Sequence, residues 1–399
     1  MSTNKAQLLA LSGRLTASIN ALSGLDDSGS HANRQAVLAI AHEIVREATL
    51  PEETWLGDMT FMCTMTASRL FIKWGAFDAI PVKGVIGYDA LAERLKLDKG
   101  LFRRVGAVLA ASKILHLVGD DHLAHTPKSL VYVDSSPYKA LSCMSFDETL
   151  KTCAYLPEYV DQHSQEPQGP VGCPYTFANG EPEKSVWEIM NKDPERMRIF
   201  MQAMSSAETL LPASKTYDLG WVKNELDKHN DRMLFIDIGG SKGHALQGVC
   251  EANEWLPRER CMLQDRKEVI DEVTTSNNPG LGGVKMMAHD FYLEQPVKGA
   301  LVYHLRRCLH DYGDEISIHI LRHISDAMAP DSRLLIVEQV CAVPPSLMDA
   351  QFDFVMMTLG GKERNATQFE NLVREVGLKI HDIHKKPSTP ISVIECVKE

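Results

Sequence analysis

The pair His310 and Asp311 stands where a predicted strand gives way to a predicted helix, in the segment VYHLRRCLHDYGDEISIHIL. Two acids occupy comparable places further on. Glu338 ends the apolar run RLLIVEQV, and Glu363 lies in the loop GGKERN. Such positions in an open α/β sheet lie at its ligand-binding edge. Because a carboxylate beside an imidazole fixes its tautomer and raises its basicity, the pattern predicts His310 as a general base oriented by Glu338 and Glu363.

A base of this kind suits a weakly acidic hydroxyl. A phenol has a pKa of about 10 and free imidazole about 6.5, so complete proton transfer is uphill by about 5 kcal/mol. Pairing with carboxylates reduces that gap, and removing the proton while the oxygen attacks avoids most of the rest.

A glycine-rich turn lies upstream, in LFIDIGGSKGHALQGV. A buried strand ends at Asp237, and Gly239 and Gly240 let the backbone of the turn approach a ligand before a helix begins. The dinucleotide pattern GxGxxG is not met, because Ile238 stands where its first glycine would be. Instead, an acid is followed by small residues at alternate positions: Asp237, Gly239, Ser241 and Gly243. This pattern resembles the S-adenosylmethionine turn of class I methyltransferases, with Ser241 replacing the middle glycine.

Two more acids follow the next two predicted strands. Asp265 ends the run CMLQD, where a carboxylate is placed to accept both hydroxyls of a ribose. Asp290 follows the next run in MMAHDFY, where its side chain can reach an adenine edge and Phe291 can stack on it. Acids in register at successive strand ends predict a nucleoside ligand.

The elements that position these residues alternate along the second half of the chain. After Asp231, helical stretches separate most of the apolar runs, which predicts a parallel sheet covered by helices on both faces. The runs are Met233–Ile238, Arg260–Leu263, Val284–Met287, Ala300–Tyr303, Arg333–Val337, Leu378–His381 and Ile391–Val397.

The first half of the chain is mainly helical. A helix is expected from about Lys5 to Leu22, and residues 34–80 continue the helical pattern. The stretch MTFMCTMTASRLFIKWGAF is apolar on nearly all sides, so it needs partners all round, and we expect a homodimer formed through it. Next, GYDALAERLKLDKGLFRRVGAVLAASKILHLVGDDHLAHT outlines a winged helix-turn-helix. It carries few basic residues and two aspartates at the tip of its wing, which disfavours DNA binding.

Composition limits the remaining classes. A chain of 399 residues, 44% hydrophobic and 24% charged, is typical of a soluble globular protein of about two domains. A net charge of -11 argues against a nucleic-acid partner, and no uncharged apolar stretch is long enough to span a membrane. The N-terminus does not resemble a secretory signal. Nine cysteines without metal-binding spacing predict reduced thiols in a cytoplasmic protein.

The motifs HLRRCLHDYGDE, LLIVEQ and GGKERNATQFENLVREVGL resemble the plant- and fungal-type O-methyltransferases, and the resemblance extends across essentially the whole chain. It implies an α/β fold. Residues 136–399 would form a Rossmann-like methyltransferase domain with a mostly parallel seven-stranded sheet. Residues 1–135 would form an N-terminal helical, winged-helix dimerisation domain.

The resemblance also implies residue roles. His310 is the general base, flanked by Glu338 and Glu363. The cofactor is S-adenosyl-L-methionine, released as S-adenosyl-L-homocysteine, and no metal is expected. The residues expected to hold the cofactor are Asp237, Gly239, Gly240, Asp265, Arg266, Asp290, Phe291 and Arg306. Those expected to contact the acceptor are Asp311, Met201, Met204, Met356 and Met357. The chain departs from the family at Ser241, at Arg266 (usually leucine) and at Tyr312 (commonly tryptophan).

The sequence therefore predicts methylation of a phenolic or enolic hydroxyl of a small secondary metabolite. An alternative is a pericyclase that keeps the fold and the bound cofactor but transfers no methyl group, as some fungal proteins resembling this family do. Such members can lose the histidine, so the presence of His310, Glu338 and Glu363 favours methyl transfer. A third possibility, a winged-helix regulator, conflicts with the charge and leaves the C-terminal domain unexplained.

Overall fold

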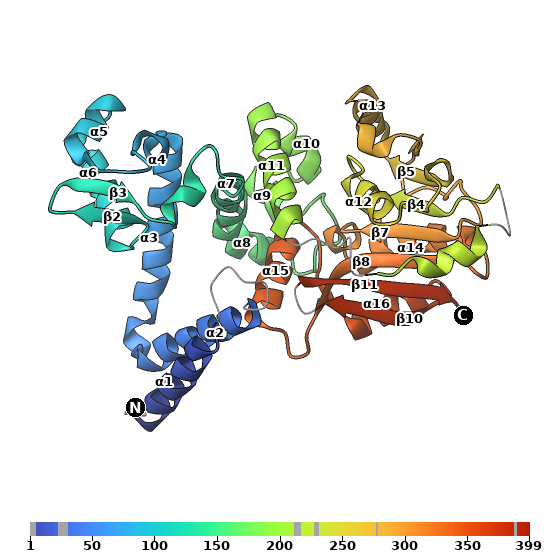
Figure 1. Cartoon of the computed structure of the whole chain (residues 1–399), viewed down its shortest axis with the longest axis horizontal. Helices are drawn as coiled ribbons and strands as arrows, with labels where there is room; N and C mark the ends of the chain where they lie inside the picture. Colours follow the sequence, from blue (N-terminus) through green and yellow to red (C-terminus); the bar gives the residue numbers. More distant parts are fainter. Residues whose placement is uncertain (1–4, 23–30, 211–216, 227–230, 277, 387–388) are drawn as a thin grey trace. The chain divides into compact units, whose positions relative to one another are not determined.

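The structure is a computed structural model that describes the whole chain except residues 1–4, 23–30, 211–216, 227–230, 277 and 387–388. The chain forms two compact units, Met1–Phe146 and Asp147–Glu399 (Figure 1). The division falls later than the expected boundary at residue 135, since α7 (Lys139–Met144) contacts the η3 turn (Ser129–Tyr132) of the first unit.

The first unit is helical apart from one small sheet. Two short helices are followed by an antiparallel hairpin whose strands flank the turn at residues 119–121, and the sheet order is β1-β3-β2. Asp98 caps the second of these helices, since its side chain accepts the backbone N–H of Leu101 at 2.7 Å. The elements are α1 (Lys5–Asn20), α2 (His31–Ala48), α3 (Thr54–Lys73), α4 (Ala76–Ala79), β1 (Ile86–Gly87), α5 (Tyr88–Arg94), α6 (Lys99–Ala111), β2 (Leu115–Val118) and β3 (His122–His125).

Helix α3 is buried over only one half of its length. Phe71 and Ile72, near its end, lie in the core of the first unit. In its first half, by contrast, Trp55 is 58% exposed, Phe61 64% and Met62 53%. The chain therefore leaves a row of large apolar side chains on this helix in contact with water.

The second unit is built on one mixed sheet with the order β10-β11-β8-β7-β4-β5-β6. Figure 1 shows its strands in yellow to red. The neighbouring strands β6, β5, β4, β7 and β8 pair in parallel. Strand β11 pairs antiparallel with both β8 and β10. The strands are β4 (Phe235–Ile238), β5 (Cys261–Asp265), β6 (Lys285–Ala288), β7 (Val302–Arg306), β8 (Arg333–Cys341), β10 (Leu378–Lys386) and β11 (Thr389–Lys398). All seven apolar runs form strands, which confirms the α/β prediction.

Side chains alternate between the two faces of this sheet, as the period of a strand requires. Phe235 and Val302 pack on one face under α12 (His244–Ala252) and α13 (Lys267–Ser276). Ile236 and Tyr303 pack on the other face under α14 (Asp314–Ala327) and α16 (Ala366–Arg374). The sheet is thus a buried central layer whose strand ends carry the loops of the site.

Helices precede the sheet, as expected for residues 136–207. They are α8 (Lys151–Gln162), α9 (Pro174–Ala178), α10 (Val186–Met190) and α11 (Pro194–Leu210), and α15 (Leu347–Thr358) lies between β8 and the two-residue strand β9 (Arg364–Asn365). Across the described residues, every helix is too short or too polar to cross a membrane.

Candidate active site

His310 lies in the short turn η8 (Leu309–Asp311), between β7 and α14. Its side chain is buried, and its Nδ1 lies 3.1 Å from Oε1 of Glu363. Its Nε2 lies 3.6 Å from Oδ1 of Asp311. A carboxylate on Nδ1 selects the tautomer that carries its proton there, which leaves the lone pair on Nε2 to take a proton.

Glu338 holds the backbone just before this histidine. Its Oε1 accepts the N–H groups of Cys308 at 2.9 Å and Leu309 at 3.0 Å. Its other oxygen is buried and has no hydrogen-bond partner among the described residues. The expectation that Glu338 ends its strand is wrong. β8 continues to Cys341, because β11 pairs with it at Gln339 and β9 pairs with its last two residues.

The surrounding carboxylates decide the charge of His310. Burial by itself would lower the pKa of the imidazole, but Glu338, Asp311 and Glu363 outweigh burial and raise that pKa to about 9. Burial raises the pKa of Glu338. A base with a pKa near 9 is closely matched to a phenolic hydroxyl, since the remaining gap costs only about 1.4 kcal/mol.

The glycine turn between β4 and α12 has the special backbone that its sequence predicts. Gly239, Ser241 and Gly243 all have positive φ angles, of 64°, 52° and 77°. Gly240 has no room for a side chain, because a Cβ there would lie 2.4 Å from Oδ2 of Asp237 and 2.5 Å from Leu263. The turn is therefore packed directly onto the strand ends beneath it.

Asp265 connects this turn to the next strand. Its Oδ2 accepts the N–H of Ser241 at 2.7 Å, and its Oδ1 accepts the N–H of Arg266 at 2.8 Å. Burial raises its pKa, although both N–H donors oppose that effect. The carboxylate is fixed by backbone donors at the end of β5, and its remaining lone pairs can accept the hydroxyls of a ribose.

Asp237 lies inside β4, which ends one residue later than expected, at Ile238. It is completely buried, and it lies directly across from His304 in the parallel pairing of β4 with β7. His304 Nδ1 lies 2.7 Å from Oδ1 of Asp237. Its Oδ2 lies under the glycine turn and has no hydrogen-bond partner among the described residues. Asp237 therefore supports the turn from below.

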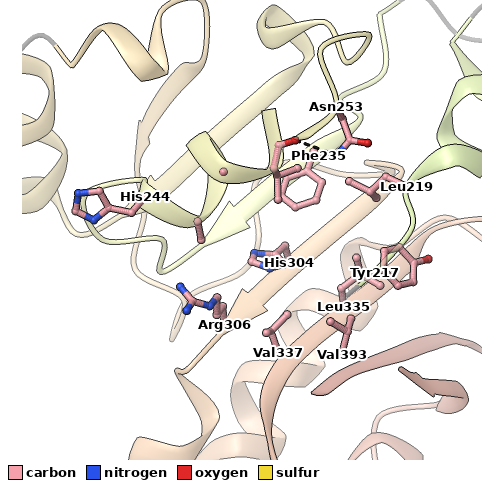
Figure 2. A pocket seen from close by; sticks show the side chains of 13 residues that line it. Tyr217, Leu219, Phe235, His244, Asn253, His304, Arg306, Leu335, Val337 and Val393 are labelled. Atoms are coloured by element: carbon pink, nitrogen blue, oxygen red, sulfur yellow. Dashed lines mark hydrogen bonds between the residues drawn. The ribbon is translucent and has the colours of Figure 1, made fainter. Parts of the chain in front are cut away.

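His304 was missed by the sequence interpretation. It lines a cavity of about 110 Å³ between the sheet and α12, together with Arg306 and His244 (Figure 2). Arg306 lies two residues after His304 on β7, so both side chains project from the same face of the sheet. Arg306, which the sequence predicts to hold the cofactor, thus lines the same cavity as residues of α12.

The other expected cofactor residues follow their strands. Arg266 is exposed, and its carbonyl accepts N–H groups of the first turn of α13. Asp290 is exposed, and its Oδ1 accepts the N–H of Tyr292 at 3.0 Å. The half-buried ring of Phe291 lies edge-on to Tyr312, with centroids 6.1 Å apart. All three residues lie at the edge that carries Asp265.

The residues expected to contact an acceptor are only partly drawn together. Asp311 lies beside the imidazole, as stated above. Met356 and Met357 lie in the last turn of α15, and their carbonyls accept the N–H groups of Gly361 and Gly360. Met201 and Met204 are half-buried on α11. For these four methionines, contact with an acceptor stays a prediction.

A second residue that the sequence interpretation missed is Arg364, which directly follows Glu363. Its side chain is fully buried and donates to the carbonyls of Leu309 and Tyr312, on either side of the pair His310–Asp311. A charged residue within the polar loop GGKERN gives no sign of burial. Within the described part of the chain, no three His, Cys, Asp or Glu side chains are arranged to hold a metal ion.

Comparison with known proteins gives the chain its relatives. The profile of the O-methyltransferase domain matches residues 154–379. The methyltransferase cfoD of Aspergillus candidus is 36% identical over 391 residues, which cover 95% of each chain. Many solved structures share the fold, among them the following two. OxaC in complex with SAH and oxaline has a TM-score of 0.86 at 22% identity, over 99% of this chain and 100% of that one. A protein described as a pericyclic reaction enzyme has a TM-score of 0.79 at 20% identity, with the same coverage.

The profile covers more than half of the chain, and the match to the Aspergillus candidus enzyme is nearly full-length. The sheet order and the turn after β4 agree with that match. The chain therefore belongs to the O-methyltransferase family, and it is an enzyme of that family.

Proposed function

We propose that this enzyme transfers a methyl group from S-adenosyl-L-methionine to a phenolic or enolic hydroxyl of a small molecule, with His310 as general base. The observation that carries the proposal is the contact between His310 Nδ1 and Glu363, in a buried loop at the carboxyl edge of the sheet. Ligands of open α/β folds bind at that edge.

The residues at the edge fit the cofactor. Asp265 offers a rigid carboxylate for the ribose, and Asp290 and Phe291 offer an acid and a ring for the adenine. Because Gly240 has no side chain, the glycine turn packs closely against Asp237 and Leu263. The opposite side of its backbone can then face a ligand. When bound, S-adenosyl-L-methionine supplies a methyl group on a positively charged sulfur and leaves as S-adenosyl-L-homocysteine.

The chain's own part in the reaction is to orient the acceptor and to move one proton. His310 takes the hydroxyl proton at Nε2, while Glu363 holds Nδ1 and the charge of the resulting imidazolium is balanced by Glu338. Asp311, beside Nε2, is placed to orient the hydroxyl. General acid–base catalysis of this kind contributes about 10²- to 10⁴-fold.

The acceptor class follows from the base. With the pKa of His310 near 9, a hydroxyl with a pKa of about 10 or below loses its proton at little cost, whereas an aliphatic alcohol does not. OxaC, which shares the fold at 22% identity, holds SAH together with the small molecule oxaline in its solved complex, and this likeness concerns the fold alone.

The experiment is an assay of the purified enzyme against a panel of phenols and enolic 1,3-dicarbonyls. Methylated product and S-adenosyl-L-homocysteine are measured together by mass spectrometry. Equal amounts of the two support the proposal. Binding of the cofactor without either product from any acidic hydroxyl would contradict it.

A pericyclase is the second candidate, and the observation that favours it is the fold shared with the pericyclic reaction enzyme. At 20% identity this likeness concerns the fold alone. The two functions differ in one readout, since a pericyclase converts its substrate without consuming the methyl donor.

We further propose that the enzyme is a homodimer formed through the first unit, which carries a winged helix. The support is the row of exposed apolar side chains on α3, Trp55, Phe61 and Met62, because contiguous apolar surface of this kind marks interaction sites. Light scattering should give twice the chain mass of 44.4 kDa, and F61D should shift the mass toward the monomer.

All nine cysteines are free thiols, which supports a reducing, cytoplasmic location.

A further inference from the structure

Among the residues that the structure describes, Arg364 is the largest fully buried side chain, and it lies immediately after Glu363. Its Nη1 donates to the carbonyl of Leu309 at 3.0 Å, and its Nη2 donates to the carbonyl of Tyr312 at 2.8 Å. These two carbonyls bracket the pair His310–Asp311. One guanidinium therefore grips the histidine turn on both sides.

The remaining donors of Arg364 extend this grip. Nε donates to Oδ1 of Asp314 at 2.9 Å, and Nη2 donates to the hydroxyl of Ser317 at 3.2 Å. Nη1 also lies 3.3 Å from the carbonyl of Lys362, in its own loop. The same cation thus bridges the loop of Glu363, the turn of His310 and the first turn of α14.

The backbone closes the contact from the other direction. The N–H of Lys362 donates to the carbonyl of His310 at 2.8 Å. Gly361 has no space for a side chain, since a Cβ would lie 2.0 Å from that carbonyl. The N–H of Glu363 donates to Oδ1 of Asp353 at 2.9 Å. Backbone hydrogen bonds and close packing therefore join the loop of Glu363 to the turn of His310, although the two residues are 53 positions apart in the sequence.

We infer that Arg364 is a positioning residue that sets the separation between the carboxylate of Glu363 and the imidazole of His310. A planar guanidinium can span two carbonyls and a carboxylate at once, which the single ammonium of a lysine cannot do. Arg364 is fully buried, so it acts by holding the loop of Glu363 against the turn of His310 and takes no part in the proton transfer itself. The inference rests on the proposed function only in taking His310 as the base.

The test needs no acceptor. The protein is labelled with ¹³C at histidine Cε1, and the His310 signal is identified as the one missing from His310→Gln. Its pKa is then measured by NMR in wild type, R364K, E363Q and the double variant. We expect R364K to lower the pKa of His310 by up to about one unit, toward the ordinary value, because Glu363 moves away from Nδ1.

Arg232 supplies a matched control. It is also a largely buried arginine that ties loops together, since it donates to the carbonyl of Gly299 at 2.5 Å and binds Asp331 at 2.6 Å and 2.8 Å. These loops precede β7 and β8, so they lie at the opposite edge of the sheet. R232K should lower stability in a similar way and leave the pKa of His310 unchanged.

The double variant decides between positioning and general damage. If Arg364 acts through Glu363, E363Q should change the pKa of His310 little further once R364K is present. Additive shifts, or a wild-type pKa in a folded R364K, would overturn the inference. Where R364K does not fold, D314N removes one of its partners and should give a smaller shift of the same sign. An unchanged pKa of His310 in D314N would then count against a positioning role for Arg364. The titration does not depend on methyl transfer, so a negative activity assay would not contradict the positioning role of Arg364.

Discussion

Glu363 reaches Nδ1 of His310 from a loop 53 residues further along the chain, at 3.1 Å. Because this contact uses Nδ1, the other nitrogen is the one that can accept a proton from a substrate. The pair therefore links the tautomer of the base to the placement of a distant loop, and the following predictions depend on that link.

The rate of turnover should depend on pH through His310. Three carboxylates raise its pKa to about 9, so the neutral, basic form grows as pH rises from 7 to 9, and turnover should rise with it. E363Q should move this limb to lower pH by about one unit and slow turnover, though by less than the loss of His310. A pH profile of kcat on any acceptor found in the panel checks this. If the apparent pKa of the rising part of the profile is the same in E363Q as in wild type, Glu363 is not the partner of Nδ1.

Stability should depend on the same group. The folded pKa of His310 lies above its unfolded value of about 6.5, so protonation of His310 stabilises the fold fully below that pH. The contribution is lost as pH rises through about 9 and amounts to at most about 3 kcal/mol. Urea unfolding of wild type and H310Q at pH 6.5 and 9.5 measures it. The difference between the two proteins should shrink at the higher pH, and a constant difference would show that the imidazole is not held in its charged form.

Cofactor affinity should depend on Asp265. Hydrogen bonds to a charged group contribute about 1.5–3 kcal/mol, so Asp265→Ala should weaken binding of S-adenosyl-L-homocysteine by about 10- to 100-fold in calorimetry. Asp271→Asn is the matched control, because that carboxylate lies on the exposed side of α13 and pairs with Lys267 at 2.6 Å. Equal affinities for wild type and Asp265→Ala would place the ribose elsewhere.

The turn should not accept a methyl group at position 240. In Gly240→Ala the new Cβ would meet Asp237 and Leu263 at 2.4 Å and 2.5 Å, so we expect a loss of about 1–3 kcal/mol in unfolding free energy, together with weaker cofactor binding. Gly57 in α3 has nothing within 4 Å of its Cβ position, so Gly57→Ala should leave cofactor binding unchanged and raise the unfolding free energy by about 0.5–1 kcal/mol, as alanine does in a helix interior. Thermal unfolding and calorimetry on the two variants make the comparison. Wild-type behaviour of Gly240→Ala would mean that the turn is not packed as described.

The sequence predicts this fold well because its signals are local. Each apolar run became a strand, and Asp265 and Asp290 follow their strands as expected, since both features depend on residues that are neighbours in the chain. Ser241 adopts the positive φ that its place in the turn requires.

The features that escaped prediction depend on register and on distant contacts. His304 pairs with Asp237 only because β4 and β7 align those two residues. β8 passes beyond Glu338 because β11 and β9 extend its pairing. Arg364 is buried because the histidine turn folds back over it, and the composition of GGKERN indicates only an exposed loop.

The most direct test of methyl transfer through His310 compares wild type with H310Q on the acceptor identified in the panel, with S-adenosyl-L-homocysteine and methylated product measured in the same reaction. Wild type should form the two in equal amounts. H310Q should form them about 10²- to 10⁴-fold more slowly while it binds the cofactor as tightly. Steady conversion of the acceptor by wild type with no S-adenosyl-L-homocysteine formed would contradict methyl transfer, and unchanged turnover by H310Q would contradict His310 as the base.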